Sequence, residues 1–212
     1  MNRLKRTEAF GLHERAVRAA LAMVDAQECC APRRSDVAAT LGEPEDRLLQ
    51  MFPNDEALLI AAAEEALIIL IDSCTKAVVK VNPNDPVGQF SALGEAYLDW
   101  ANQHQAQFRL ISDPTRPDLL NLPQLRRYID SITDLMTRML KRALEAGQLH
   151  PREDIFLLVL AARSFAYGLA RMIVDGRMKD WGPPGLAPVD TAKLLAGDFV
   201  RRMARSSQPP SS

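Results

Sequence analysis

The 212-residue sequence is poor in aromatic residues, cysteine and histidine, and its positive and negative charges nearly cancel. The formal net charge is −1, so no overall excess of lysine and arginine points to nucleic acid or to an anionic membrane surface. Apolar residues make up 47% of the chain, which is enough for a sizeable core. Any contact with a polyanion must therefore be local.

The cysteines and histidines lack the spacing of a metal or redox site. Cys29 and Cys30 are adjacent, Cys74 is remote, and no pair has the two-residue spacer of zinc or disulfide-exchange motifs. We expect these thiols to be reduced and buried. The three histidines are widely separated and have no carboxylate or cysteine at ligand spacing. The sequence predicts neither a metal site nor a bound cofactor.

Long uninterrupted apolar runs are also missing. The most apolar stretch, residues 57–71, contains Glu64 and Glu65, which are costly in the middle of a bilayer. The basic residues near the N-terminus are not followed by an apolar run, which argues against a signal or transit peptide. We expect a cytoplasmic protein without membrane insertion.

Strand patterns are nearly absent, whereas apolar residues recur at helical spacing from end to end, so the sequence predicts an all-α fold. About nine helices are expected, over residues 8–27, 35–41, 44–51, 54–79, 86 to about 100, 104–111, 121–147, 152–176 and 190–205. Asn54 and Asp85 are suited to cap helices, and Pro151 to open one. Gly42 suits a turn.

The N-terminal part resembles one family of regulators. Residues 19–24, 36–38, 52–53 and 56–58, together with Gly42 and Leu48, are similar without a gap to the helix-turn-helix domain of the tetracycline-repressor (TetR) family. Residues 165–169 resemble a C-terminal helix of one subclass of that family. The resemblance implies a DNA-binding domain over residues 1–53 and a larger helical ligand-binding and dimerisation domain over residues 54–205. The terminal residues 206–212 are expected to form a disordered tail.

The residue types at these positions have a physical reason. Val37, Ala38 and Leu48 can pack two short helices against Leu21 and Val24, which would hold the second short helix outward for a major groove. The alternative is a three-helix module that packs only for stability.

Few basic residues are placed to contact DNA. Arg47 is the only cation on the expected reading helix, and an arginine can bridge the two acceptors of guanine. Arg33 and Arg34 precede the other short helix and are expected to meet phosphate. Basic residues between Arg3 and Arg6 could form an additional arm. The predicted DNA-binding set is Arg33, Arg34, Ser35, Arg47 and Gln50.

The same segment departs from the family. Residues 35–56 contain one basic and six acidic side chains, a local net charge of −5. Leu49, Met51 and Asp55 stand where the family usually has residues that contact phosphate. Since DNA affinity arises largely from neutralised phosphates, this composition opposes strong binding, although carboxylates in first turns also stabilise helices.

Two functions therefore stay open. The first is a DNA-binding transcriptional regulator, typically a repressor, that a small hydrophobic molecule releases from its operator. The alternative is a TetR-like fold that has lost DNA binding and acts as a lipid or small-molecule binding protein. An enzyme is not expected, because Arg163, Ser164 and Tyr167 have no nucleophile–base partner and no phosphate loop is present.

Aromatic and methionine side chains at helical spacing in the C-terminal part fit either a plain core or a ligand site between helices. A fatty-acid-like ligand would suit such a lining, with His104, Arg109 or Arg163 to anchor a carboxylate. The predicted ligand-binding residues are Leu70, Cys74, Phe90, Tyr97, Trp100, Phe108, Met136, Met139, Phe165 and Met172.

Surplus apolar surface on the last two long helices predicts a homodimer. Residues 152–176 are apolar on almost every face, and residues 190–205 carry one apolar stripe, so pairing as a four-helix bundle would bury both. The predicted interface residues are Phe156, Leu160, Leu169, Leu195, Phe199 and Met203.

Overall fold

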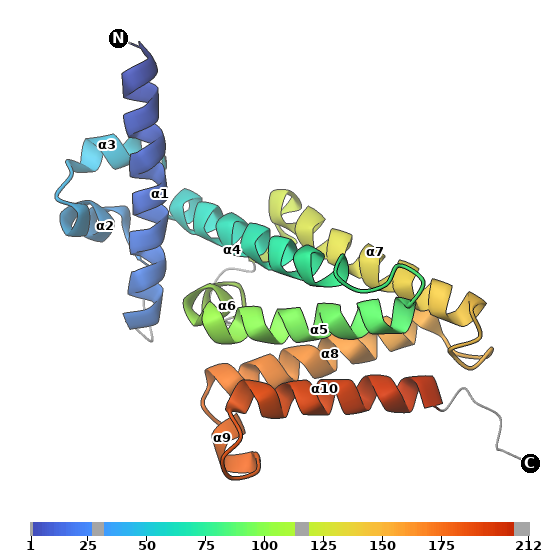
Figure 1. Cartoon of the computed structure of the whole chain (residues 1–212). Coiled ribbons are helices and arrows are strands. Elements are labelled where there is room, and N and C mark those ends of the chain that lie inside the picture. Colours follow the sequence, from blue (N-terminus) through green and yellow to red (C-terminus); the bar gives the residue numbers. More distant parts are fainter. Residues whose placement is uncertain (1, 27–31, 113–118, 206–212) are drawn as a thin grey trace, which may run out of the picture. The chain divides into compact units, whose positions relative to one another are not determined.

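The structure, a computed structural model, describes residues 2–26, 32–112 and 119–205, and within these ranges it contains helices and no strands (Figure 1). The predicted all-α fold is confirmed. The helices are α1 (Asn2–Ala26), α2 (Arg34–Leu41), α3 (Glu45–Leu49), α4 (Asp55–Val78), α5 (Pro86–Gln103), α6 (Gln105–Ser112), η1 (Leu119–Asn121), α7 (Pro123–Glu145), α8 (Ile155–Val174), α9 (Met178–Trp181) and α10 (Pro188–Arg205).

The chain forms two compact units. Unit 1 comprises Met1–Ile68 with Gln105–Arg126, and unit 2 comprises Ile69–His104 with Arg127–Ser212. The helix-turn-helix segment thus shares unit 1 with α6, while α4 contributes residues to both units. A division into residues 1–53 and 54–205 stays a prediction about which segment folds and acts independently.

In unit 1, α1 packs against α2 and α6, and α2 packs against α3. Val37, Ala38 and Leu48 are buried as predicted, and so are Leu21 and Val24 of α1. Gly42 joins α2 to α3 with φ of 65°, a left-handed conformation that a residue with a Cβ adopts only at a cost. The buried side chains and this turn fix the orientation of α3.

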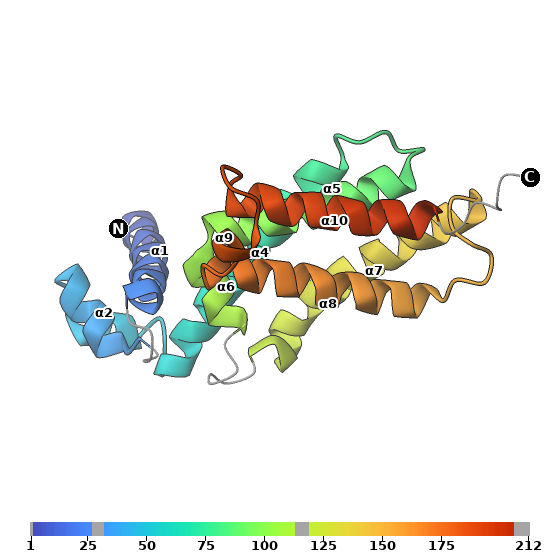
Figure 2. The same ribbon diagram turned by 90° about the horizontal axis from the view of Figure 1, so that it is seen from below.

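In unit 2, α5, α8 and α10 lie side by side (Figure 2). Each helix contributes apolar side chains to a shared core, including Phe90 and Trp100 of α5, Leu169 of α8, and Ala192 and Met203 of α10. Burial of such side chains is the main stabilising contribution to a helical unit of this kind.

Two predicted helix caps are confirmed, and one helix start was wrong. Asn54 accepts a hydrogen bond from the backbone of Ala57 at 2.7 Å, and Asp85 accepts one from Gly88 at 2.9 Å. Helix α8 does not begin after Pro151. It begins at Ile155, because Asp154 accepts hydrogen bonds from the next free backbone N–H groups and so sets the N-terminus.

Other boundaries also differ from the sequence-based expectation. Helix α1 begins at Asn2 rather than near residue 8, so the backbone of Arg3 and Arg6 is helical. The structure adds the short helices η1 and α9. The predicted disordered tail over residues 206–212, as well as Cys29 and Cys30, lies outside the described residues.

Among the described residues, α8 is the one helix whose length and composition would allow it to cross a membrane. Core helices of soluble proteins satisfy the same criterion. The charged residues Arg163 and Arg171 lie within α8, and such side chains are costly at membrane depth. Within unit 2, one part of α8 packs against α5, α9 and α10.

Candidate functional site

Helices α2 and α3 form a helix-turn-helix in unit 1. Leu48 of α3 is fully buried, and Phe52, which follows this helix, lies in ring contact with His13 of α1 at a centroid distance of 4.9 Å. These contacts leave the outer face of α3 exposed, with Glu45, Asp46 and Arg47 on it. A short helix held rigidly and exposed in this way has the geometry needed to enter a major groove.

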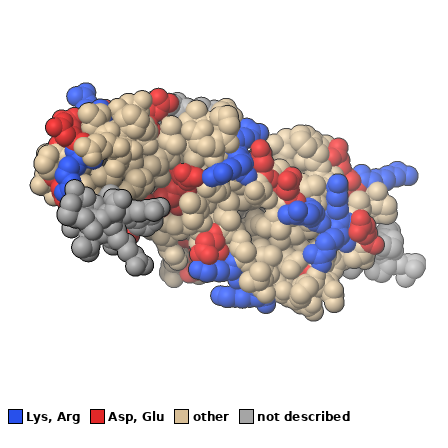
Figure 3. Space-filling view, turned by 90° about the horizontal axis from the view of Figure 1, so that it is seen from above, with Lys and Arg blue, Asp and Glu red and all other residues tan. Residues whose placement is uncertain are grey.

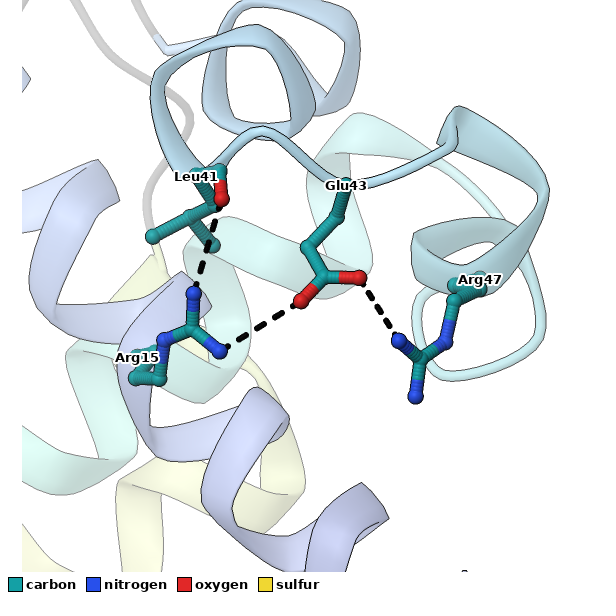
Figure 4. Close-up of polar contacts among 4 residues, drawn as sticks. All are labelled: Arg15, Leu41, Glu43 and Arg47. Carbon is teal, nitrogen blue, oxygen red and sulfur yellow. Dashed lines mark hydrogen bonds and ion pairs between the residues drawn. The ribbon is translucent and has the colours of Figure 1, made fainter.

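Arg47 lies on the outer face of α3, and its guanidinium is engaged in an ion pair with Glu43. Its Nη1 donates to Glu43 Oε2 at 2.7 Å, and the other oxygen of the same carboxylate lies 3.4 Å from Nη1 of Arg15 (Figure 4). Arg15 also donates through Nη2 to the carbonyl of Leu41 at 3.5 Å. Glu43 therefore links α1 to α3 and competes with any phosphate or base for both guanidinium groups.

Arg34 was predicted to meet phosphate, but its side chain is engaged within the protein. Its backbone N–H and Nε donate to the same oxygen of Asp55, at 2.9 and 3.0 Å, and its Nη1 donates to the carbonyl of Phe52 at 3.1 Å. Arg33, the N-cap residue of α2, makes no capping hydrogen bond with its side chain. Asp55 of α4 takes this role instead, because it accepts a hydrogen bond from the free backbone N–H of Arg34, the first residue of α2.

The remaining predicted DNA-binding residues lie on the surface. Arg33, Ser35 and Gln50 are exposed, at the start of α2 and the end of α3. Leu49, an apolar residue, is 48% exposed on the same helix as Arg47. On the face of the molecule in Figure 3, basic and acidic side chains form small mixed groups, and the described residues make no continuous basic area there. The assignment of these five residues to DNA stays a prediction.

The ion pair between Arg34 and Asp55 leads to a stability prediction. The backbone N–H of Arg34, followed by its guanidinium, holds the pKa of Asp55 below its ordinary value of 3.8, against an opposing effect of burial. Asp55→Ala should lower the free energy of unfolding at pH 7 by about 1 kcal/mol, because the start of α2 loses its acceptor; the half-exposed carboxylate keeps the effect modest.

A depressed folded pKa means that the ionised carboxylate stabilises the fold above pH 3.8 and that this contribution disappears as the pH falls through the folded pKa. The gap between wild type and Asp55→Ala, measured by urea denaturation, should therefore shrink between pH 5 and pH 2. Asp55→Asn is the matched control, because it keeps an oxygen acceptor without the charge and should lose less stability. Equal unfolding midpoints for wild type and Asp55→Ala at pH 7 would contradict this role.

Most of the predicted ligand-binding residues lie inside unit 2. Tyr97 and Met172 are half-buried, and Phe165 is partly exposed with its ring against Phe199 at 5.2 Å, so it faces α10. Phe108 is buried in unit 1. The other members are buried in unit 2: Leu70, Cys74, Phe90, Trp100, Met136 and Met139. Their burial fits a core and a ligand lining equally, so this assignment stays a prediction.

The predicted dimer residues divide into three groups, of which Phe199 alone forms the half-buried one. Phe156, Leu160 and Leu195 are 73%, 51% and 44% exposed, so they are available to a partner. Leu169 and Met203 are instead buried within the chain. Sequence reasoning missed Leu157 and Leu194, which are also exposed on α8 and α10, because periodicity alone did not separate the packed face of each helix from its free face.

Among the described residues, no group of three or more His, Cys, Asp or Glu side chains could hold a metal ion. Burial raises the pKa of the Cys74 thiol to about 12, and this thiol lies 3.9 Å from the carbonyl of Leu93. A thiol with so high a pKa is protonated at neutral pH and is a poor nucleophile.

Comparison with known proteins agrees with this architecture. Residues 90–193 match the family model of the tetracyclin repressor-like C-terminal domain. A solved TetR-family regulatory protein from Rhodococcus RHA1 is 19% identical and has a TM-score of 0.68 over 94% of this chain and 98% of its own. The TetR-family regulator PfmR from Thermus thermophilus is 21% identical, with a TM-score of 0.67 over 90% and 97%.

The ketosteroid transcriptional regulator KstR2 of Mycobacterium tuberculosis is 18% identical, with a TM-score of 0.65 over 92% of this chain and 93% of its own. No curated protein sequence matches the chain. At these identities the solved structures show a common fold, and the C-terminal match adds agreement in sequence. Residues 90–193 thus match the tetracyclin repressor-like C-terminal domain, and the described residues share the fold of solved TetR-family regulators.

Proposed function

We propose that this protein is a dimeric, ligand-responsive DNA-binding regulator in the cytoplasm, and that it represses transcription until a small hydrophobic molecule releases it from its operator. The observation that carries the proposal is the helix-turn-helix of unit 1, in which α3 is anchored by Leu48 and exposes Arg47 and Gln50. A rigid exposed helix with a guanidinium and an amide can read base edges in the major groove.

The dimer is supported by exposed apolar side chains on α8 and α10. Phe156, Leu157 and Leu160 lie on α8, and Leu194 and Leu195 lie on α10, and all five are exposed in the single chain. Large apolar side chains exposed on two packed helices are typical of a protein–protein interface. A symmetric pair of chains would also present two reading helices to the two half-sites of a palindromic operator.

A second candidate function has its own support. Glu43 is ion-paired with both Arg47 and Arg15, and Asp55 is ion-paired with Arg34, so three arginines on or near α2 and α3 are held by carboxylates. A protein of this fold that has lost DNA binding and only carries a small molecule would show the same pattern. The two functions differ in whether DNA is bound at all.

Fluorescence anisotropy with labelled DNA from upstream of the protein's own gene separates these functions. The regulator should bind this DNA selectively at low salt, and Arg47→Ala should cost about 1–3 kcal/mol and relax base preference at one position in each half-site. Arg33→Ala should weaken binding to all sequences alike, because its expected partner is phosphate.

Arg171→Ala is the matched control, since this arginine lies in unit 2 and pairs with Asp175 at 3.0 Å. Its DNA affinity should equal that of wild type. If the wild-type protein binds no DNA sequence selectively even at low salt, the regulator proposal fails and the ligand-binding protein becomes the better account.

A further inference from the structure

Four helices of unit 2 contribute polar side chains to one group. Arg163 of α8 donates through Nη1 to the hydroxyl of Thr133 of α7 at 3.0 Å. Tyr97 of α5 lies within electrostatic reach of Arg163, of Tyr167 one turn further along α8, and of Cys74 of α4. These residues are all in unit 2, so their grouping does not depend on the placement of unit 1.

The guanidinium of Arg163 has no counter-ion within the described part of the chain. Its one described hydrogen bond goes to Thr133, a neutral acceptor, whereas Arg171 of the same helix pairs with a carboxylate, that of Asp175. A planar guanidinium can donate two parallel hydrogen bonds to a carboxylate. Arg163 therefore retains the capacity to take one.

Tyr97 adds a hydroxyl within electrostatic reach of Arg163. Burial raises the pKa of this phenol, with smaller contributions from Tyr167 and Cys74, while Arg163 lowers it. The phenol is therefore protonated at neutral pH and can donate. No described residue is hydrogen-bonded to it, and its ring is stacked on that of Trp100 at a centroid distance of 6.1 Å.

The other basic residues considered from sequence are placed differently. Arg109 lies on α6 in unit 1, with Gln105 as a partner at 3.4 Å. His104 follows α5 and packs its ring against Trp100 at 6.4 Å. Of the three, Arg163 is the cation that lies within electrostatic reach of the Tyr97 hydroxyl and lowers its pKa.

We propose that Arg163, with the hydroxyls of Tyr97 and Thr133, binds the carboxylate of an amphipathic monoanionic ligand. A site with one cation and two neutral hydroxyls balances the single negative charge of a carboxylate, whereas a phosphate monoester carries about two negative charges. The apolar side chains of unit 2 suit the hydrocarbon part of such a molecule, and they include Phe90, Met136 and Met139. This inference rests on the proposed ligand-binding function and specifies the chemistry of its ligand.

Trp100 provides a reporter for the test. It is buried and stacked beside Tyr97, whereas the second tryptophan, Trp181, is 78% exposed on α9. In a full-length Trp181→Phe protein, fluorescence therefore reports on Trp100 alone. The probes are dodecanoate and dodecan-1-ol, which share a hydrocarbon chain and differ in the charge of the head group.

Dodecanoate should bind about 10- to 100-fold more tightly than dodecan-1-ol, and Arg163→Gln should abolish this preference by weakening dodecanoate binding to the same extent. Tyr97→Phe should weaken dodecanoate binding by about fivefold. Arg171→Gln is the control and should change neither affinity. Because Arg163 is exposed, its replacement should leave the fold intact, which near-ultraviolet circular dichroism checks.

The two ways in which the test can fail are distinguishable. Equal affinity for both probes in wild type and Arg163→Gln would overturn the carboxylate site while leaving a binding site for apolar molecules. Binding of neither probe would overturn the carboxylate site and count against the proposed ligand response itself.

Discussion

Leu160→Asp should convert the protein from a dimer to a monomer at micromolar concentration. Leu160 is 51% exposed on α8 of the single chain, so the substitution leaves the interior of each protomer intact. In a two-fold symmetric dimer the change occurs twice, and each copy places an unpaired carboxylate in an apolar interface at a cost of several kcal/mol. Dimer affinity should fall by about a thousandfold or more.

Sedimentation velocity over a concentration series measures this change. Leu195→Asp on α10 should have the same effect, whereas Val79→Asp is the control, because Val79 is an exposed apolar residue that follows α4 and belongs to neither α8 nor α10. The choice of residue matters: Leu169 is buried within the chain, so its replacement would disturb folding as well as association. A wild-type protein that sediments as a monomer would refute the proposed interface.

Glu43→Gln should strengthen DNA binding. The substitution removes the carboxylate that holds Arg47 of α3 at 2.7 Å and Arg15 of α1 at 3.4 Å, and so frees two guanidinium groups for phosphate. Each additional phosphate contact raises affinity by about tenfold at 0.1 M salt and steepens the salt dependence by about 0.9. A dimer that gains one contact in each half-site should therefore bind about a hundredfold more tightly.

Anisotropy titrations at two salt concentrations measure both quantities. Glu45→Gln is a matched control, since it removes the same charge from an exposed residue of α3 for which no ion pair is described. The control should strengthen binding less and change the salt slope little. In the double variant Glu43→Gln with Arg47→Ala, most of the gain should be lost. If Glu43→Gln and Glu45→Gln behave alike, Glu43 acts only through its charge and does not restrain the arginines.

The sequence predicted much of the fold because the relevant signals are local. Helical periodicity extends over neighbouring turns, and the caps at Asn54 and Asp85 act on backbone groups three residues away. The start of α8 was missed because Pro151 and Asp154 both favour a helix N-terminus and lie three residues apart. The structure shows that the side chain of Asp154 sets the first turn.

The candidate sites depended more strongly on tertiary structure. By itself, the sequence determined an all-α chain with a helix-turn-helix, a single arginine on the second short helix of that motif, and a strongly apolar helix near the C-terminus. Only the fold decided that Glu43 meets Arg15 across 28 residues, that Asp55 meets Arg34 across 21, and that Arg163 meets Thr133 across 30. Helical spacing relates residues three or four apart, whereas these contacts are set by how separate helices pack, which no local pattern encodes.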